Sequence, residues 1–225
     1  MNLSEISKDI KTSFLEGFDH NAVPDDEYTD FSYPKLIKLM RFHTDRFIVN
    51  DFGHLFLMHT KTAFGMELLT CSFMPNTGKG VPYLLIDTMT VGKKRCVFVE
   101  YYDMTADLND QSELIEVGEK YKDLSDYTEK PAWYIDKRQR YSLIKGGTAA
   151  DDDVFRNMMI DSVNAYHKAV MKAEVKADNL LGLESFRERM IRDGNPSSSV
   201  LNKVFGEKGA EEFFCKCVMP MKEEL

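Results

Sequence analysis

One aspartate lies inside an apolar run near the middle of the chain. Asp87 sits between Ile86 and Thr88 in the run from Val81 to Met89. A carboxylate in such a setting must be paired, hydrogen-bonded or neutral, because the loss of water raises its pKa. A carboxyl group that is protonated near neutral pH can donate a proton to a reacting molecule. Asp87 is therefore the first candidate for a catalytic residue.

The elements that must position Asp87 are two strands. Apolar runs from 66 to 74 and from 81 to 89 flank a turn built from Pro75, Asn76, Gly78 and Gly80. Runs of this length that are bounded by Pro, Gly and Asn are typical of buried strands joined by a loop. The carboxyl group of Asp87 would then be held by a rigid inner strand.

Further strands and helices surround this pair. Alternating or β-rich stretches predict strands over 42–48, 52–62 and 96–102, and Gly146-Gly147 is read as a turn. Helical periodicity predicts helices over 3–18, 111–121, 151–170, 185–191, 195–205 and 210–219, with a stop at Gly206. Repeated strands with short turns favour an antiparallel meander. We expect one domain, residues 1–225, folded as a three-layer α/β/α sandwich with a central antiparallel sheet flanked by helices.

Composition limits the classes of function. The chain has 225 residues, of which 43% are hydrophobic and 29% charged, and its net charge is -8. These values fit a globular domain and argue against a general nucleic-acid binder. No apolar run is long enough to span a membrane, and the first eleven residues lack a signal-peptide pattern, so a cytoplasmic protein is expected.

The cysteines do not predict a metal site. Cys71 and Cys96 lie in predicted strands and are expected in the core. Cys215 and Cys217 are spaced like metal ligands, but no second pair and no nearby His completes a set. No glycine-rich phosphate loop, nucleophile elbow or zinc motif is present. Chemistry without a bound metal is expected.

A histidine and a lysine alternate on the strand before the central pair. His59 and Lys61 are two residues apart, so their side chains point to the same face of the strand. That face is either exposed to solvent, as is usual for Lys, or one wall of an anion-binding pocket next to Asp87.

The order and spacing of several short motifs resemble the ferredoxin-dependent bilin reductases. Members of this family reduce open-chain tetrapyrroles on an α/β/α sandwich without flavin, metal or nicotinamide. The resemblance runs from about Met58 to Met219. The motifs that carry it are Cys71, Pro75, Pro82 and Asp87 in the hairpin, Lys130-Pro131-Ala132-Trp133, Asp151-Asp152-Asp153-Val154-Phe155, and the segment from Val200-Leu201 through Phe205-Gly206 to Ala210.

The resemblance implies roles for the two residues of the hairpin. Asp87 occupies the position of the family's proton-donating aspartate, and a carboxyl group that is neutral near pH 7 suits the protonation of a radical pyrrole intermediate. Thr70 stands where some members have His and others Asn. The resemblance thus implies that Thr70 contacts the substrate, although a Thr hydroxyl is not a strong acid.

Four further positions follow the family's pattern in part. His59 matches a His on one strand, whereas Lys61 stands where a branch of the family has Glu. Asn195 stands where part of the family has an Asp that donates a second proton. Lys145 lies near the position of an Arg that holds a substrate propionate, and a Lys can still pair with a carboxylate. The resemblance implies that His59 takes part in catalysis and that Lys61, Lys145 and Asn195 bind substrate.

Two classes of function are therefore open. The first is an enzyme that reduces a linear tetrapyrrole such as biliverdin, with electrons from external ferredoxin or flavodoxin and Asp87 as proton donor. The second is a protein that binds a tetrapyrrole without reducing it. A red chlorophyll catabolite reductase-like enzyme is a third choice. Lys137, Arg138 and Arg140 are either a docking site for an acidic electron donor or a solvated basic loop.

Overall fold

A single antiparallel sheet runs through the middle of the computed structural model, which describes residues 1–103, 110–176 and 179–221. Within these residues the sheet has eight strands in the order β1-β3-β4-β5-β6-β7-β8, and β2 also pairs with β3. The strands are β1 (His20–Ala22), β2 (Asp30–Tyr33), β3 (Met40–Val49), β4 (Gly53–Thr62), β5 (Met66–Met74), β6 (Tyr83–Val91), β7 (Lys94–Tyr102) and β8 (Leu143–Thr148).

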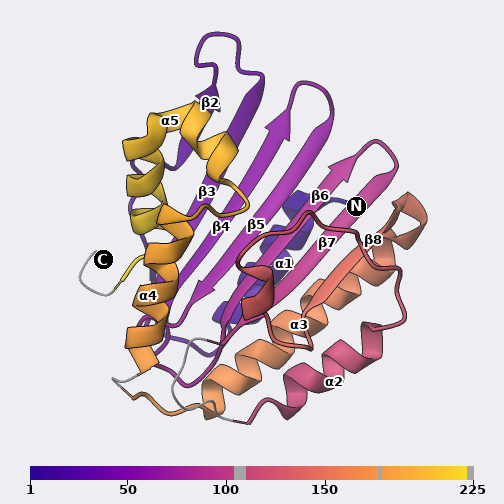
Figure 1. Ribbon diagram of the computed structural model, residues 1–225, viewed down its shortest axis with the longest axis vertical. Helices are drawn as coiled ribbons and strands as arrows, with labels where there is room; N and C mark the ends of the chain where they lie inside the picture. The colour runs from indigo at the N-terminus through magenta and orange to yellow at the C-terminus, as the bar shows by residue number, and fades with distance from the viewer. Residues whose placement is uncertain (104–109, 177–178, 222–225) are drawn as a thin grey trace.

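Helices cover both faces of the sheet (Figure 1). One face is packed by α1 (Leu3–Leu15) and α3 (Asp152–Lys172), with α2 (Ser112–Tyr121) lying against α3. The opposite face carries α4 (Asn179–Arg192), α5 (Ser198–Phe213) and a π-helical turn, η3 (Phe214–Val218). Short 3-10 turns, η1 (Ile135–Lys137) and η2 (Ala149–Asp151), complete the described elements. Within the described ranges no helix has the length and apolar character needed to cross a bilayer. The expected three-layer α/β/α sandwich is confirmed.

Two hydrophobic cores result, one on each side of the sheet. The first core lies beneath α1 and α3 and contains the inward residues of the central strands, such as Phe73, Leu84 and Val97. The second core lies beneath α4 and α5 and contains Phe56 and Tyr83 from the same strands. Because side chains alternate along a strand, each central strand contributes to both cores. Alternate positions of the same strands therefore face opposite cores.

The strand register is continuous across the centre of the sheet. Met58 pairs with Thr70, Thr70 with Asp87, and Asp87 with Phe98, so these four residues cross β4 to β7 in one row. Cα partners in adjacent strands share a face. The row that contains Asp87 faces α5, whereas the next row, which contains His59, faces the first core.

Most of the expected elements are present, with one correction. The stop at Gly206 is seen as a kink in α5, where Gly206 has φ 73°. The Gly146-Gly147 turn is wrong, because both residues lie in β8. A Cβ on Gly147 would come within 2.9 Å of the Phe155 ring, so glycine allows α3 to pack close to this strand.

Candidate active site

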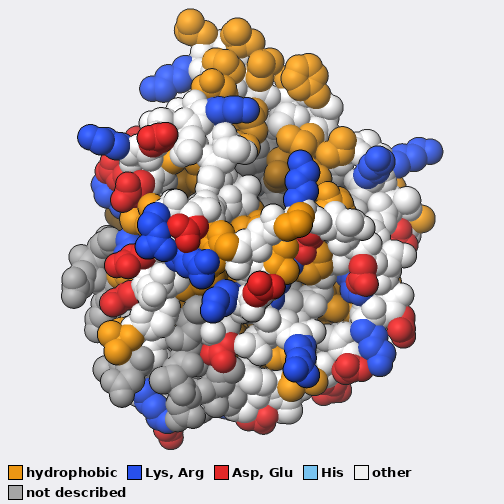
Figure 2. Space-filling view, in the orientation of Figure 1, with side chains coloured by type: hydrophobic (Ala, Val, Ile, Leu, Met, Phe, Trp, Pro, Cys, Tyr) orange, Lys and Arg blue, Asp and Glu red, His pale blue; other side chains and the backbone are white. Residues whose placement is uncertain are grey.

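A cavity of about 430 Å³ lies between the sheet and the start of α5. Its floor is formed mainly by apolar residues of β3 to β7, namely Met40, Phe42, Met58, Met66, Leu68, Met89 and Phe98. The start of α5 and the two residues before it, Pro196 and Ser197, form one side, and the segment from Tyr127 to Arg138 forms the other. Figure 2 shows this face of the molecule, where hydrophobic side chains gather beside α5 with charged groups among them. A largely apolar cavity with a few polar groups is typical of a small-molecule site.

Asp87 faces this cavity from the middle of β6. Its neighbours Leu84 and Ile86 fill the first core, so the alternation of the strand directs Asp87 to the opposite face. Its Oδ1 accepts a hydrogen bond of 2.5 Å from the Thr70 hydroxyl. Burial raises the pKa of Asp87 from 3.8 to about 6, and the bond from Thr70 opposes this rise. The two hairpin residues chosen from the sequence, Asp87 and Thr70, are thus in contact.

A second acid in the cavity was not singled out from the sequence. Glu100 on β7 is 2% exposed and lines the same cavity. Its Oε1 accepts a 2.6 Å hydrogen bond from the Tyr102 hydroxyl and lies 2.5 Å from Nη2 of Arg138. Burial raises the pKa of Glu100 to about 7, and Arg138 opposes that rise. The signal was present in the sequence, since Glu100 is a lone acid in the apolar run from 96 to 102.

Arg138 is an internal residue of the site. Its guanidinium makes two hydrogen bonds to Glu129, of 2.5 Å from Nη1 and 2.7 Å from Nη2, besides its contact with Glu100. The side chain is 8% exposed. The interpretation of Arg138 as part of an exposed basic cluster is therefore corrected, and only Lys137 and Arg140 of that cluster are exposed.

Asn195 lies beside the cavity but uses its side chain to build the loop before α5. Its Nδ2 donates to the Met190 carbonyl at 3.2 Å, and its Oδ1 accepts from the Ser197 amide at 3.0 Å. It also lines a small extension of the cavity, of about 20 Å³, which Asp87 and Tyr83 share. Asn195 therefore sits close to Asp87, while its amide is already paired within the loop.

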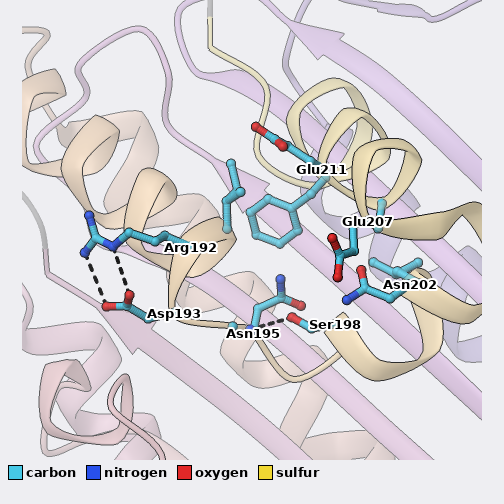
Figure 3. A pocket seen from close by; sticks show the side chains of 12 residues that line it. Arg192, Asp193, Asn195, Ser198, Asn202, Glu207 and Glu211 are labelled. Carbon is cyan, nitrogen blue, oxygen red and sulfur yellow. Dashed lines mark hydrogen bonds and ion pairs between the residues drawn. The ribbon is translucent and has the colours of Figure 1, made fainter.

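The other side of this loop borders a second hollow, shown in Figure 3. It has a volume of about 450 Å³ and is lined by polar residues that include Asn202, Glu207 and Glu211. The ion pair between Arg192 and Asp193 lies at its edge. This hollow is as large as the first, but the two buried acids with raised pKa line the first. We therefore place the candidate site in the cavity that holds Asp87.

His59 and Lys61 do not line that cavity. Both side chains point to the opposite face of the sheet, where His59 Nε2 lies 3.1 Å from Glu67 Oε2. Lys61 is 56% exposed and lies 3.8 Å from Glu67 Oε1. Of the two interpretations of this face, a pocket wall next to Asp87 is excluded by the strand register, because neighbouring positions of a strand point to opposite faces. The residues of β4 that reach the cavity are Met58 and Thr60.

Lys145 also lies on the side of the sheet away from Asp87. It occupies the row of Val97, whose side chain belongs to the first core. Its ammonium donates to the carbonyls of Lys122 and Leu124, at 2.7 and 2.9 Å, and pairs with Asp126 at 2.7 Å. The expectation that Lys145 holds a substrate carboxylate is corrected, since its three donor positions fasten the segment after α2.

The donor set of the cavity favours proton transfer. Carboxyl groups with raised pKa can exchange protons near neutral pH, and an apolar wall strengthens their interaction with a bound molecule. Within the described residues, no group of three or more His, Cys, Asp or Glu side chains is arranged to hold a metal ion. Cys71 and Cys96 are buried in the sheet, as expected.

Comparison with known proteins gives a likeness in three dimensions only. No family model matches the sequence, and no curated protein matches it. Among solved structures, phytochromobilin synthase from tomato in complex with biliverdin is similar, with a TM-score of 0.79 and 15% sequence identity. The match covers 96% of this chain and 82% of that chain. The chain thus shares the fold of that solved structure, and this three-layer sandwich is the fold that the sequence motifs predicted.

Proposed function

We propose that this protein reduces a linear tetrapyrrole in the cavity beneath α5, with Asp87 as a proton donor. The electrons come one at a time from ferredoxin or flavodoxin. The observation that carries the proposal is the position of Asp87, a carboxyl group with a raised pKa facing an apolar cavity. The likeness in fold to a solved protein in complex with biliverdin supports the choice of ligand.

The cavity suits a flat, largely apolar molecule with acidic side groups. Methionine, leucine and phenylalanine side chains form its floor and can pack against pyrrole rings. The exposed Lys130 borders the cavity and is placed to meet a propionate, whereas Arg138 is engaged by Glu129 and Glu100. The propionates of the substrate would therefore lie toward Lys130, and the reacting rings toward Asp87.

The second candidate function is binding without reduction. Two observations favour it. Thr70, the hydrogen-bond partner of Asp87, is not an acid, and the amide of Asn195 is already paired within its loop. The protein would then hold a tetrapyrrole in the same cavity and leave its double bonds unchanged. A red chlorophyll catabolite reductase-like activity is a variant of the first candidate with a different linear tetrapyrrole.

Two assays on the wild-type protein separate these candidates. Biliverdin added to the purified protein should show a shifted and sharper visible absorption band, because the cavity holds the ligand in one conformation. Ferredoxin, its reductase and NADPH, added without oxygen, should then bleach or shift that band further as a double bond is reduced. A red chlorophyll catabolite is tested in the same two assays.

Each outcome assigns one function. A spectrum unchanged at high micromolar protein, for both tetrapyrroles, contradicts the proposal and the binding alternative together. A shifted band that does not change with either ferredoxin or flavodoxin supports the binding protein. Turnover of the chlorophyll catabolite without turnover of biliverdin assigns the third candidate.

A further inference from the structure

Two acids of the cavity lie on adjacent strands of the same sheet face. Asp87 on β6 is the Cα partner of Phe98, and Glu100 follows Phe98 by two residues on β7. Glu100 is therefore a diagonal neighbour of Asp87, at about 7–8 Å between Cα atoms. Both side chains line the cavity beneath α5. A flat ligand that fills this cavity would touch both carboxyl groups.

The charges around Glu100 favour a proton on this residue. Glu100 and Glu129 share one guanidinium, and Arg138 donates two hydrogen bonds to Glu129. With both glutamates ionised the trio would carry a net negative charge, and Asp87 faces the same cavity. Glu100 is the more buried of the two glutamates, at 2% against 23% exposed, so ionisation costs more at Glu100.

Among the described residues, the remaining neighbours of Glu100 do not supply a compensating positive charge. Tyr102 donates a hydrogen bond to Glu100, and Tyr134 borders the same cavity. Lys130 is exposed at the rim, where water screens its charge. The pKa of Glu100, raised to about 7, agrees with this arrangement. Such a group can give up a proton and regain one near neutral pH.

We propose that Glu100 is the second proton donor of the site, working beside Asp87 on the same bound ligand. This inference rests on the proposed reduction of a linear tetrapyrrole. Glu100 on β7 then supplies the second proton. Asn195, in the loop before α5, is unable to supply it because its side chain is an amide.

The reaction balances with these two acids. Reduction of one double bond takes up two electrons and two protons. The electrons come singly from an iron–sulfur or flavin electron-transfer protein, and each carboxyl group releases one proton to the ligand. Two new bonds to hydrogen form, one π bond is lost, and both carboxylates recover a proton from water.

The first test needs no ligand. Infrared spectra of the wild-type protein are recorded as the pH is raised from 5 to 8, and the carbonyl band of neutral carboxyl groups is assigned by its loss in Glu100→Gln and in Asp87→Asn. We expect a band from Glu100 that disappears as the pH rises through neutrality. A Glu100 that is ionised throughout this range overturns the inference, whatever the protein binds.

The second test follows a single turnover of biliverdin with reduced ferredoxin in the absence of oxygen. Glu100→Gln should bind biliverdin with little change in affinity but complete the reduction about 100-fold more slowly or worse, because it lacks one general acid. A one-electron-reduced bilin radical should accumulate and be detected by electron paramagnetic resonance. Glu100→Asp should recover part of the rate.

The matched control is Glu67→Gln, which removes a carboxylate from β5 on the opposite face of the sheet, beside His59. It should turn over like the wild type. A Glu100→Gln variant that does the same, with no radical, overturns the role of Glu100 and leaves the proposed function standing. A wild-type protein that does not reduce biliverdin contradicts both the proposed function and the role of Glu100 as a donor in it. The infrared titration still reports whether Glu100 carries a proton.

Discussion

The two faces of the sheet are built from the same strands and have opposite properties. Beneath α1 and α3 the face is filled, and Phe73 meets Phe14 and Tyr166 edge to face. Beneath α5 the same strands leave a cavity of about 430 Å³ that holds Asp87 and Glu100. The two carboxyl groups whose pKa is raised by burial both lie on the face where packing is incomplete.

This contrast shows how a fold can separate stability from chemistry. Close packing on one face holds the strands rigidly, and the open face can then carry acids that would be costly in a filled core. Adjacent residues such as Ile86 and Asp87 point to opposite faces of the sheet. Matched changes on the two faces should therefore have different effects.

The largest effect is expected from the acid of the open face. Asp87→Asn keeps the size of the side chain and removes its proton, so turnover of biliverdin should fall by about 10²- to 10⁴-fold. Binding, measured by the visible absorption band, should remain. Asp45→Asn is the control, because Asp45 pairs with Lys11 of α1 on the filled face and should retain activity. Normal turnover by Asp87→Asn would make Asp87 a structural residue.

A matched pair of phenylalanines tests the packing contrast. Phe73→Ala should lower the free energy of unfolding by about 3–5 kcal/mol, because it opens a cavity in the filled core. Phe98→Ala, on the open face, removes a ring that already borders a cavity and should cost well under half as much. Urea unfolding of both variants gives the two values. Equal losses would mean that the open face is packed as tightly as the filled one.

The two acids should make stability depend on pH. Their pKa values in the folded protein, about 6 for Asp87 and about 7 for Glu100, lie above their ordinary values of 3.8 and 4.5. The folded state therefore binds protons more tightly than the unfolded state, and this contribution is complete below about pH 4. It is lost as the pH rises to about 7, so the free energy of unfolding should decrease over that range. Urea midpoints of Asp87→Asn and Glu100→Gln should show a flatter dependence.

A smaller effect is expected from the hydroxyl beside Asp87. Thr70→Val removes the hydrogen bond that favours the ionised carboxyl, so the pKa of Asp87 should rise further. In the proposed reaction Asp87 acts as an acid, so the loss of turnover at alkaline pH should move to higher pH. The pH dependence of single-turnover rates measures the shift. A shift to lower pH would contradict the assigned hydrogen bond.

The smallest effect is expected from the lysine on the far side of the sheet. Lys61→Ala should change neither the affinity for biliverdin nor the turnover rate, because Lys61 is exposed and pairs with Glu67 away from the cavity. A titration followed by visible absorption checks the affinity. A loss comparable to that of Asp87→Asn would place the ligand on the opposite face from the one proposed.

Sequence reasoning found the central hairpin because its signal is local. The apolar runs of β5 and β6, the turn between them and the misplaced carboxyl of Asp87 can all be read from one stretch of chain. The same reasoning passed over Glu100, although it is an equally isolated acid in an apolar strand. Arg138 could not be assigned, because its partners Glu100 and Glu129 come from different elements and meet only in the folded protein.

The sequence by itself determined the pattern of elements, since periodicity and turn residues act over a few neighbours, and it determined that Asp87 would be an unusual acid. Only the tertiary structure decided which residues share its cavity. Strand register places His59, Lys61 and Lys145 on the filled face. It places Thr70 and Glu100 on the same face as Asp87. The physical reason is the two-residue period of a strand, by which a shift of one position moves a side chain to the opposite face of the sheet.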